Sequence, residues 1–120
     1  MINEKSPQAI VAFTELTRDT TNTSSGTCTA WKCGQLVQVK VTATMSSTAS
    51  GTWNAYRIFS GLPKAVSESQ RTPTLAVDNY TGNNPPFCAV NTSGELFLQT
   101  RSEAMSGKTI IGGFTYMCSN

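Results

Sequence analysis

Residues 37–45 alternate strictly between apolar and polar side chains, and this run constrains the fold more than any other. The apolar positions are Val37, Val39, Val41, Ala43 and Met45. Gln, Lys or Thr stands at each position between them. Because successive side chains of a β-strand point to opposite faces, the pattern predicts a strand with one buried face. The chain is therefore expected to form a β-sheet with one side against a core.

A hairpin is predicted just before this strand, with a two-residue loop at Cys33-Gly34. Gly34 can supply the positive φ that a tight turn needs. The predicted register pairs Lys32 with Gln35, Trp31 with Leu36, Ala30 with Val37 and Cys28 with Val39. Cys28 and Ala30 would then lie on the buried face of the valines. This register predicts an exposed Cys33 thiol and a buried Cys28 thiol.

The rest of the chain adds several short strand signals, separated by segments rich in Gly, Pro, Asn and Ser. These signals cover residues 52–60, 75–77, 87–90, 95–100 and 109–118. With six to eight short strands and no helix signal after residue 16, the sequence predicts an all-β, antiparallel, jelly-roll-like β-sandwich. Its expected core includes Val37, Val39, Val41, Ile58, Leu96, Leu98, Phe114 and Tyr116. Gly112-Gly113 predicts a bulge, or a place where another backbone passes closely.

Residues 1–25 differ from residues 26–120, and we interpret them as a stalk or linker before a head domain. Ser6-Pro7 is typical of a helix start. Ile10, Phe13 and Leu16 follow at spacings of three, so the segment is expected to be a short amphipathic helix or an extended stretch along a neighbour. It is either a frayed terminus or the end of a stalk. A helix this short needs a partner, and the sequence predicts a homotrimer with Ile10, Phe13 and Leu16 in its interface.

Composition and residue types exclude several functions. Charged residues make up 13% of the chain and the net charge is only +2, which argues against a nucleic-acid partner. No apolar run reaches the roughly 18 residues of a membrane span. The N-terminus lacks a secretory signal pattern, so export would require lysis, a particle, or a leader preceding this sequence.

Catalytic and metal chemistry also lack their usual residues. The chain has no histidine, so Ser-His-Asp and Cys-His sites cannot form. The four cysteines lack zinc-ligand spacing; three disulfide pairings are possible, although buried thiols fit the alternation better. The seven carboxylates are scattered, whereas a glycosidase needs two across one cleft. We expect no enzyme activity, no cofactor and no metal.

Two stretches combine aromatic rings with polar groups, as sugar-binding sites do. The candidate residues are Trp53, Tyr56 and Arg57 in the first stretch, and Tyr80, Asn83 and Asn84 in the second. Two structural alternatives stay open. Trp53 and Tyr56 could lie in the core or in a subunit interface, and Tyr80 could pack locally within its loop.

Four segments resemble the C-terminal head domains of bacteriophage tail-fibre and receptor-binding proteins, especially those of phages that infect gut and Gram-positive bacteria. They are Trp-Lys-Cys-Gly with Val-x-Val-x-Val (31–41), Phe-Ser-Gly-Leu-Pro-Lys (59–64), Asn-Thr-Ser-Gly-Glu-Leu-Phe-Leu (91–98) and Gly-Lys-Thr-Ile-Ile-Gly-Gly-Phe-Thr-Tyr (107–116). The resemblance covers roughly residues 26–117, and Cys33 and Cys118 depart from it.

The resemblance implies a trimeric head on a stalk, carried at the tail tip or fibre of a virion among other tail proteins. It implies attachment to a glycan or protein of the host surface, without catalysis. Two other functions stay open from the sequence. One is a structural fibre or capsid-decoration domain, and the other is a carbohydrate-binding module of a bacterial protein.

Overall fold

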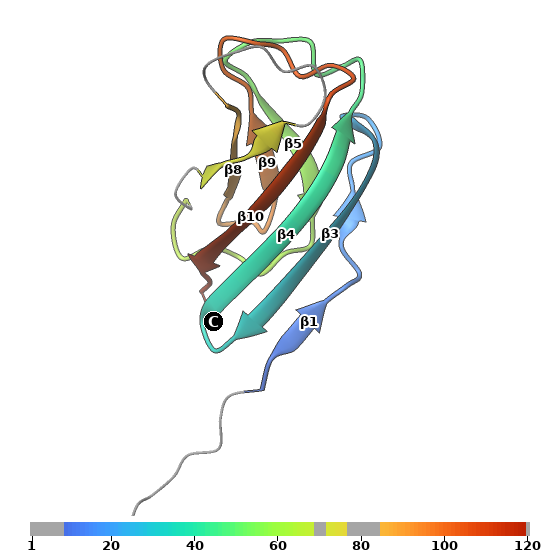
Figure 1. Cartoon of the computed structure of the whole chain (residues 1–120). Helices are drawn as coiled ribbons and strands as arrows, with labels where there is room; N and C mark the ends of the chain where they lie inside the picture. The colour runs from blue at the N-terminus through green and yellow to red at the C-terminus, as the bar shows by residue number, and fades with distance from the viewer. Residues whose placement is uncertain (1–8, 69–71, 77–84, 120) are drawn as a thin grey trace, which may run out of the picture.

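Two antiparallel sheets of five strands each pack face to face as a β-sandwich (Figure 1). The computed structural model describes residues 9–68, 72–76 and 85–119. Sheet A has the strand order β1-β3-β4-β10-β7, and sheet B has the order β2-β5-β9-β8-β6. The strands are β1 (Val11–Phe13), β2 (Thr17–Arg18), β3 (Thr23–Cys33), β4 (Leu36–Met45), β5 (Ala55–Ser60), β6 (Thr72–Pro73), β7 (Leu75–Ala76), β8 (Phe87–Val90), β9 (Leu96–Gln99) and β10 (Thr109–Met117). The described residues contain no helix, and so none that could cross a bilayer.

The long hairpin of β3 and β4 lies in sheet A, but its register differs from the predicted one by two residues. The loop is Gly34-Gln35, and Cys33 pairs with Leu36. Gly34 has φ +61°, which suits the first central position of a type II′ turn. A shift of two residues keeps every side chain on its face. Cys28 is therefore buried and Cys33 exposed, as predicted.

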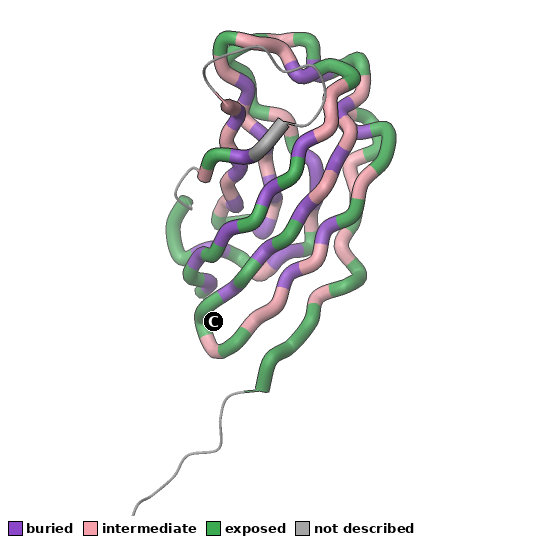
Figure 2. The backbone as a smooth tube through the Cα atoms, viewed as in Figure 1, coloured by how far each residue is buried: buried purple, intermediate pink, exposed green. Residues whose placement is uncertain are grey.

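The predicted core residues are all buried between the two sheets. They are Val37, Val39, Val41, Ile58, Leu96, Leu98, Phe114 and Tyr116. Along β4 and β10, buried and more exposed residues alternate, as Figure 2 shows. This alternation is the expected signature of sheets that bury one face each.

Strand β10 crosses Gly112-Gly113 without the predicted bulge. Its pairing with β4 is continuous from Thr109 to Met117, and Gly112 lies opposite Val41. A Cβ atom at residue 112 would lie 3.0 Å from Thr74 Cγ2 and 3.2 Å from Val41 Cγ1. Side chains, rather than another backbone, therefore occupy the space that this glycine leaves.

Strand β5 does contain a pairing irregularity. Arg57 lies opposite Phe97 and Phe59 lies opposite Leu96, so Ile58 is the extra residue. Ile58 and Phe59 are both buried as a result. This bulge explains the imperfect alternation of the sequence here, because an extra residue shifts the faces by one.

The segment before β3 is extended and belongs to both sheets. β1 pairs with β3, and β2 pairs with β5. Of the two expectations for this segment, the helix is wrong for the described residues 9–16 and the extended form is confirmed. Pairing with β3 satisfies backbone groups that a short isolated helix would satisfy only weakly. Strand β3 itself starts at Thr23, and its pairing with β4 is irregular between Thr23 and Ser25.

Candidate sugar-binding face

The outer face of sheet B carries the best candidate site. The central strands β5, β9 and β8 lie side by side there. Ala55, Gln99 and Phe87 form one cross-strand row, and Arg57, Phe97 and Ala89 form the next. A hollow of about 310 Å³ lies over this surface. Its lining consists of Ala55, Glu68, Phe87, Ala89, Val90, Asn91, Phe97 and Gln99. This volume falls at the lower end of ligand pockets, about 300–1,000 Å³.

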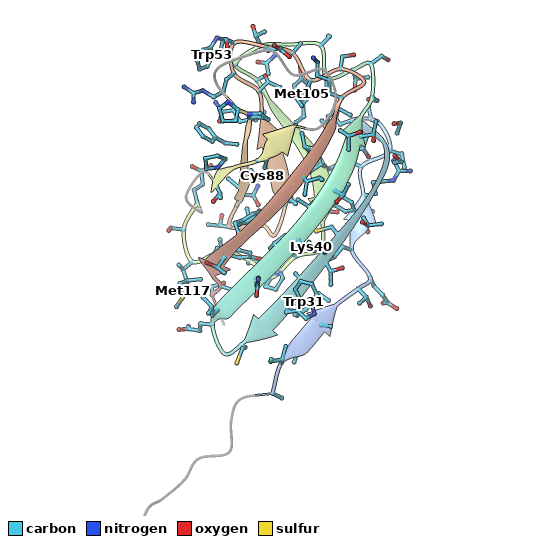
Figure 3. The ribbon with its side chains drawn as sticks, viewed as in Figure 1. Trp31, Lys40, Trp53, Cys88, Met105 and Met117 are labelled. Carbon is cyan, nitrogen blue, oxygen red and sulfur yellow. The ribbon has the colours of Figure 1, made fainter. Side chains whose placement is uncertain are left out.

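An arginine and two aromatic rings meet at one end of this face. The Arg101 Cζ atom lies 4.8 Å from the centre of the Phe87 ring and 5.4 Å from the centre of the Trp53 ring. Both distances suit cation–π attraction. Trp53 lies at the end of the sandwich opposite the β3–β4 hairpin (Figure 3). Trp53 is 58% exposed.

Trp53 is held in an unusual backbone conformation. Its φ is +56°, which is rare for a bulky residue and costs of order 1–2 kcal/mol. The Trp53 N–H donates a hydrogen bond to the Arg101 carbonyl at 3.0 Å. Strained residues persist only where their surroundings determine them, and they gather at binding sites.

Thr100 fixes the segment that carries Trp53. Its buried hydroxyl accepts a hydrogen bond from the Asn54 N–H at 3.1 Å and donates to the Gly51 carbonyl at 2.8 Å. The Thr100 N–H donates to the Asn54 carbonyl at 2.8 Å. Residues 51–54 are thus anchored to the end of β9, and the backbone of Trp53 is held in place.

The structure separates the members of the first predicted stretch. Trp53 and Arg57 lie at the outer surface of sheet B. Tyr56 instead packs against the core, and its hydroxyl accepts a hydrogen bond from the Gly51 N–H at 2.8 Å. Tyr80, Asn83 and Asn84 fall outside the described residues. Trp53 is thus the predicted aromatic residue that the structure places on an open face.

Arg57 is already engaged in two ion pairs. Its guanidinium donates to Asp19 at 2.9 Å and to Glu95 at 3.0 Å. Burial opposes ionisation of Asp19, but N–H groups of Asn22 and Thr21 and the Arg57 guanidinium outweigh it and lower the pKa of that carboxyl. Hydrogen bonds from Asn91 and Arg57 lower the pKa of Glu95. Arg57 therefore joins three segments of sheet B, and its charge is balanced by two carboxylates.

Sequence reasoning missed Arg101, Phe87, Phe97, Gln99 and Glu68. The sequence did contain a signal for two of them, Phe87 and Phe97. Leu96-Phe97-Leu98 and Phe87-Cys88 place apolar residues on both faces of their strands. In a sheet with one solvated face, an aromatic residue at an outward position indicates a covered or binding surface.

The residues predicted for a trimer interface do not form one exposed stripe. Phe13 and Leu16 are half-buried against the core of their own chain, whereas Ile10 is exposed. The stripe was derived from helical spacing, which the extended backbone removes. A different apolar group lies beside the β3–β4 hairpin, where Leu36, Val66 and Met117 are exposed around a hollow of about 350 Å³.

Metal-binding clusters are absent from the part of the chain that the structure describes. All four cysteines lie in that part, and none forms a disulfide. Family models, curated proteins and solved structures all lack a match to this chain.

Proposed function

We propose that this chain is a sugar-binding head that attaches its parent particle to a cell-surface glycan. The main support for this proposal is the preorganised set of Trp53, Arg101 and Phe87 beside the hollow on sheet B. Aromatic rings stack on the apolar C–H patches of sugars, and neighbouring amides orient the hydroxyls. Gln99, which lines the hollow, supplies such an amide.

Binding without catalysis fits the composition of the face. Glu68 is the single carboxylate among the described residues that line the hollow. Glycoside hydrolysis uses two carboxylates flanking the bond to be cleaved. The proposal therefore assigns the face to recognition.

The particle is proposed to be a phage tail fibre or tail tip, on the strength of the sequence resemblance. A homotrimer suits this role, because three weak sugar sites on one head gain avidity. Its other partners would be virion tail proteins and the host surface.

The exposed Leu36, Val66 and Met117 favour a second candidate, a structural virion domain that contacts neighbouring chains through this group. A carbohydrate-binding module of a bacterial protein would use the same sheet B face.

We expect the purified chain to bind glycans on a glycan array. Trp53→Ala should weaken this binding by roughly tenfold or more, which corresponds to about 1.4 kcal/mol of binding free energy. Trp53 is exposed, so its removal should leave the fold intact. Leu36→Ala is the matched control, because Leu36 is an exposed apolar residue of the other sheet. Equal loss in both variants, or no bound glycan, would contradict the proposal.

A further inference from the structure

The two arginines of the sheet B face are in different electrostatic states. Arg57 is neutralised by Asp19 and Glu95. Arg101 contacts the Trp53 and Phe87 rings, and no carboxylate of the described residues lies within ion-pair distance of it. Aromatic rings hold a guanidinium in place but do not neutralise it. Arg101 thus keeps a positive charge and in-plane N–H donors beside the hollow.

The position of Arg101 is determined by its neighbours. Its carbonyl accepts the Trp53 N–H, and the preceding Thr100 is buried and hydrogen-bonded to residues 51–54. Gln99 lies two residues before Arg101 and pairs with Phe87, whose ring Arg101 contacts. An arginine fork fixed in this way loses little side-chain entropy when it binds a planar anion.

The two ends of the hollow along β8 carry opposite charges. Arg101 contacts Phe87, the first residue of β8. Glu68 lines the hollow from the segment whose Ala65 N–H donates to the carbonyl of Asn91, just beyond the other end of β8. The two ends of β8, Phe87 and Val90, are three residue steps apart, about 10 Å. A ligand with one acidic group can therefore place that group at Arg101 and keep it away from Glu68.

We propose that the glycan is acidic and that Arg101 binds its carboxylate, with Gln99 and the Trp53 and Phe87 rings contacting the same sugar unit. This inference rests on the proposed function and names its ligand class. A carboxylate is planar and accepts two parallel N–H bonds from one guanidinium. Uronic acids and sialic acids carry such a group next to the apolar C–H surface that aromatic rings bind.

The test measures binding to matched pairs of sugars by the intact chain. The pairs are oligogalacturonides with their carboxyl-reduced forms, and sialylated lactose with lactose. Mannose 6-phosphate is the phosphate probe. Arg101→Gln and Arg101→Lys are compared with Lys40→Gln, which removes an equal charge from the exposed face of sheet A (Figure 3). Thermal unfolding of each variant confirms that it remains folded.

The expected result is preference for the carboxylated member of at least one pair. Arg101→Gln should weaken that binding roughly 10- to 100-fold, Arg101→Lys should recover part of it, and Lys40→Gln should leave it unchanged. Neutral sugars bound equally well with and without Arg101 would overturn this inference and leave the proposed function standing. A preference for mannose 6-phosphate would overturn the carboxylate assignment. Binding to no sugar would overturn both.

Discussion

Raising the pH above 9 is expected to destabilise this protein steeply, because it buries three weak acids in their neutral forms. Burial raises the pKa of the Cys28 thiol to about 12. Burial, together with the nearby Cys28, raises the pKa of the Cys88 thiol further. Burial also raises the pKa of the Tyr116 phenol, whose O–H donates to the Pro63 carbonyl at 2.6 Å.

The direction of the effect follows from proton linkage. Unfolded cysteines lose their protons near pH 9.0 and unfolded tyrosine near pH 10.0, while the folded groups keep theirs. The folded state then binds more protons than the unfolded state, so stability falls as pH rises. Each group contributes up to about 1.4 kcal/mol per pH unit within its window. By about pH 11 the loss should be on the order of 5 kcal/mol, comparable to the whole stability of many domains.

Urea unfolding in reductant at pH 7, 9, 10 and 11 measures this effect. The double variant Cys28→Ala/Cys88→Ala should lose much of the alkaline slope, whatever its stability at pH 7. The matched control is Cys33→Ala, which removes an exposed thiol and should keep the wild-type slope. If the double variant and wild type lost stability in parallel from pH 9 to 11, the neutral buried thiols would not be the cause.

Replacing Gly94 with alanine is expected to cost about 2–5 kcal/mol of unfolding free energy. Gly94 lies in the β8–β9 loop with φ +79°, and a Cβ atom there would lie 2.3 Å from the Leu62 carbonyl oxygen. That loop is tied to the chain after β5, because the Leu62 N–H donates to the Gly94 carbonyl at 3.1 Å. The variant therefore combines left-handed backbone strain at residue 94 with a steric clash against the Leu62 backbone, which its hydrogen bond to Gly94 holds in place.

Gly107→Ala separates these two causes. Gly107 has a similar φ of +73°, but a Cβ atom there would meet nothing within 4 Å. Its substitution should cost only the left-handed strain, about 1–2 kcal/mol. Urea unfolding of both variants gives the comparison. Equal losses of unfolding free energy at the two positions would contradict a close contact between this loop and Leu62.

The half-buried strands were predictable because burial of one face repeats every two residues. Strand β4 matches the alternating run 37–45, and β8 matches its predicted span 87–90. The faces of Cys28 and Ala30 were predictable for the same reason. The hairpin register was not, because Cys33-Gly34 and Gly34-Gln35 both place Gly34 in a two-residue loop and both keep the valines inward.

The N-terminal strands were harder to predict because their partners are distant. Ile10, Phe13 and Leu16 fit helical spacing, yet β1 gains backbone partners from β3, some twenty residues away. Short segments take the structure that tertiary pairing offers them, and local spacing cannot reveal that pairing.

The candidate site was predictable only in part. Trp53 was among the aromatic candidates, but the sequence favoured Tyr80, which lies outside the described residues, and left open a place for Trp53 in the core or in a subunit interface. Phe87 and Arg101, the neighbours of Trp53, come from two other parts of the chain, and only the strand order β5-β9-β8 brings the three together. That order depends on how the chain crosses between sheets, which the residue pattern does not encode.

Amide chemical-shift mapping by NMR can show directly whether sugar binds to the outer face of sheet B. The ¹⁵N-labelled chain would be titrated with the glycan that binds best on the array. We expect the largest shifts to cluster at Trp53, Ala55, Phe87, Gln99 and Arg101, while the outer face of sheet A stays unchanged. Shifts concentrated around Leu36 and Met117, or spread over both sheets without saturation, would contradict this expectation.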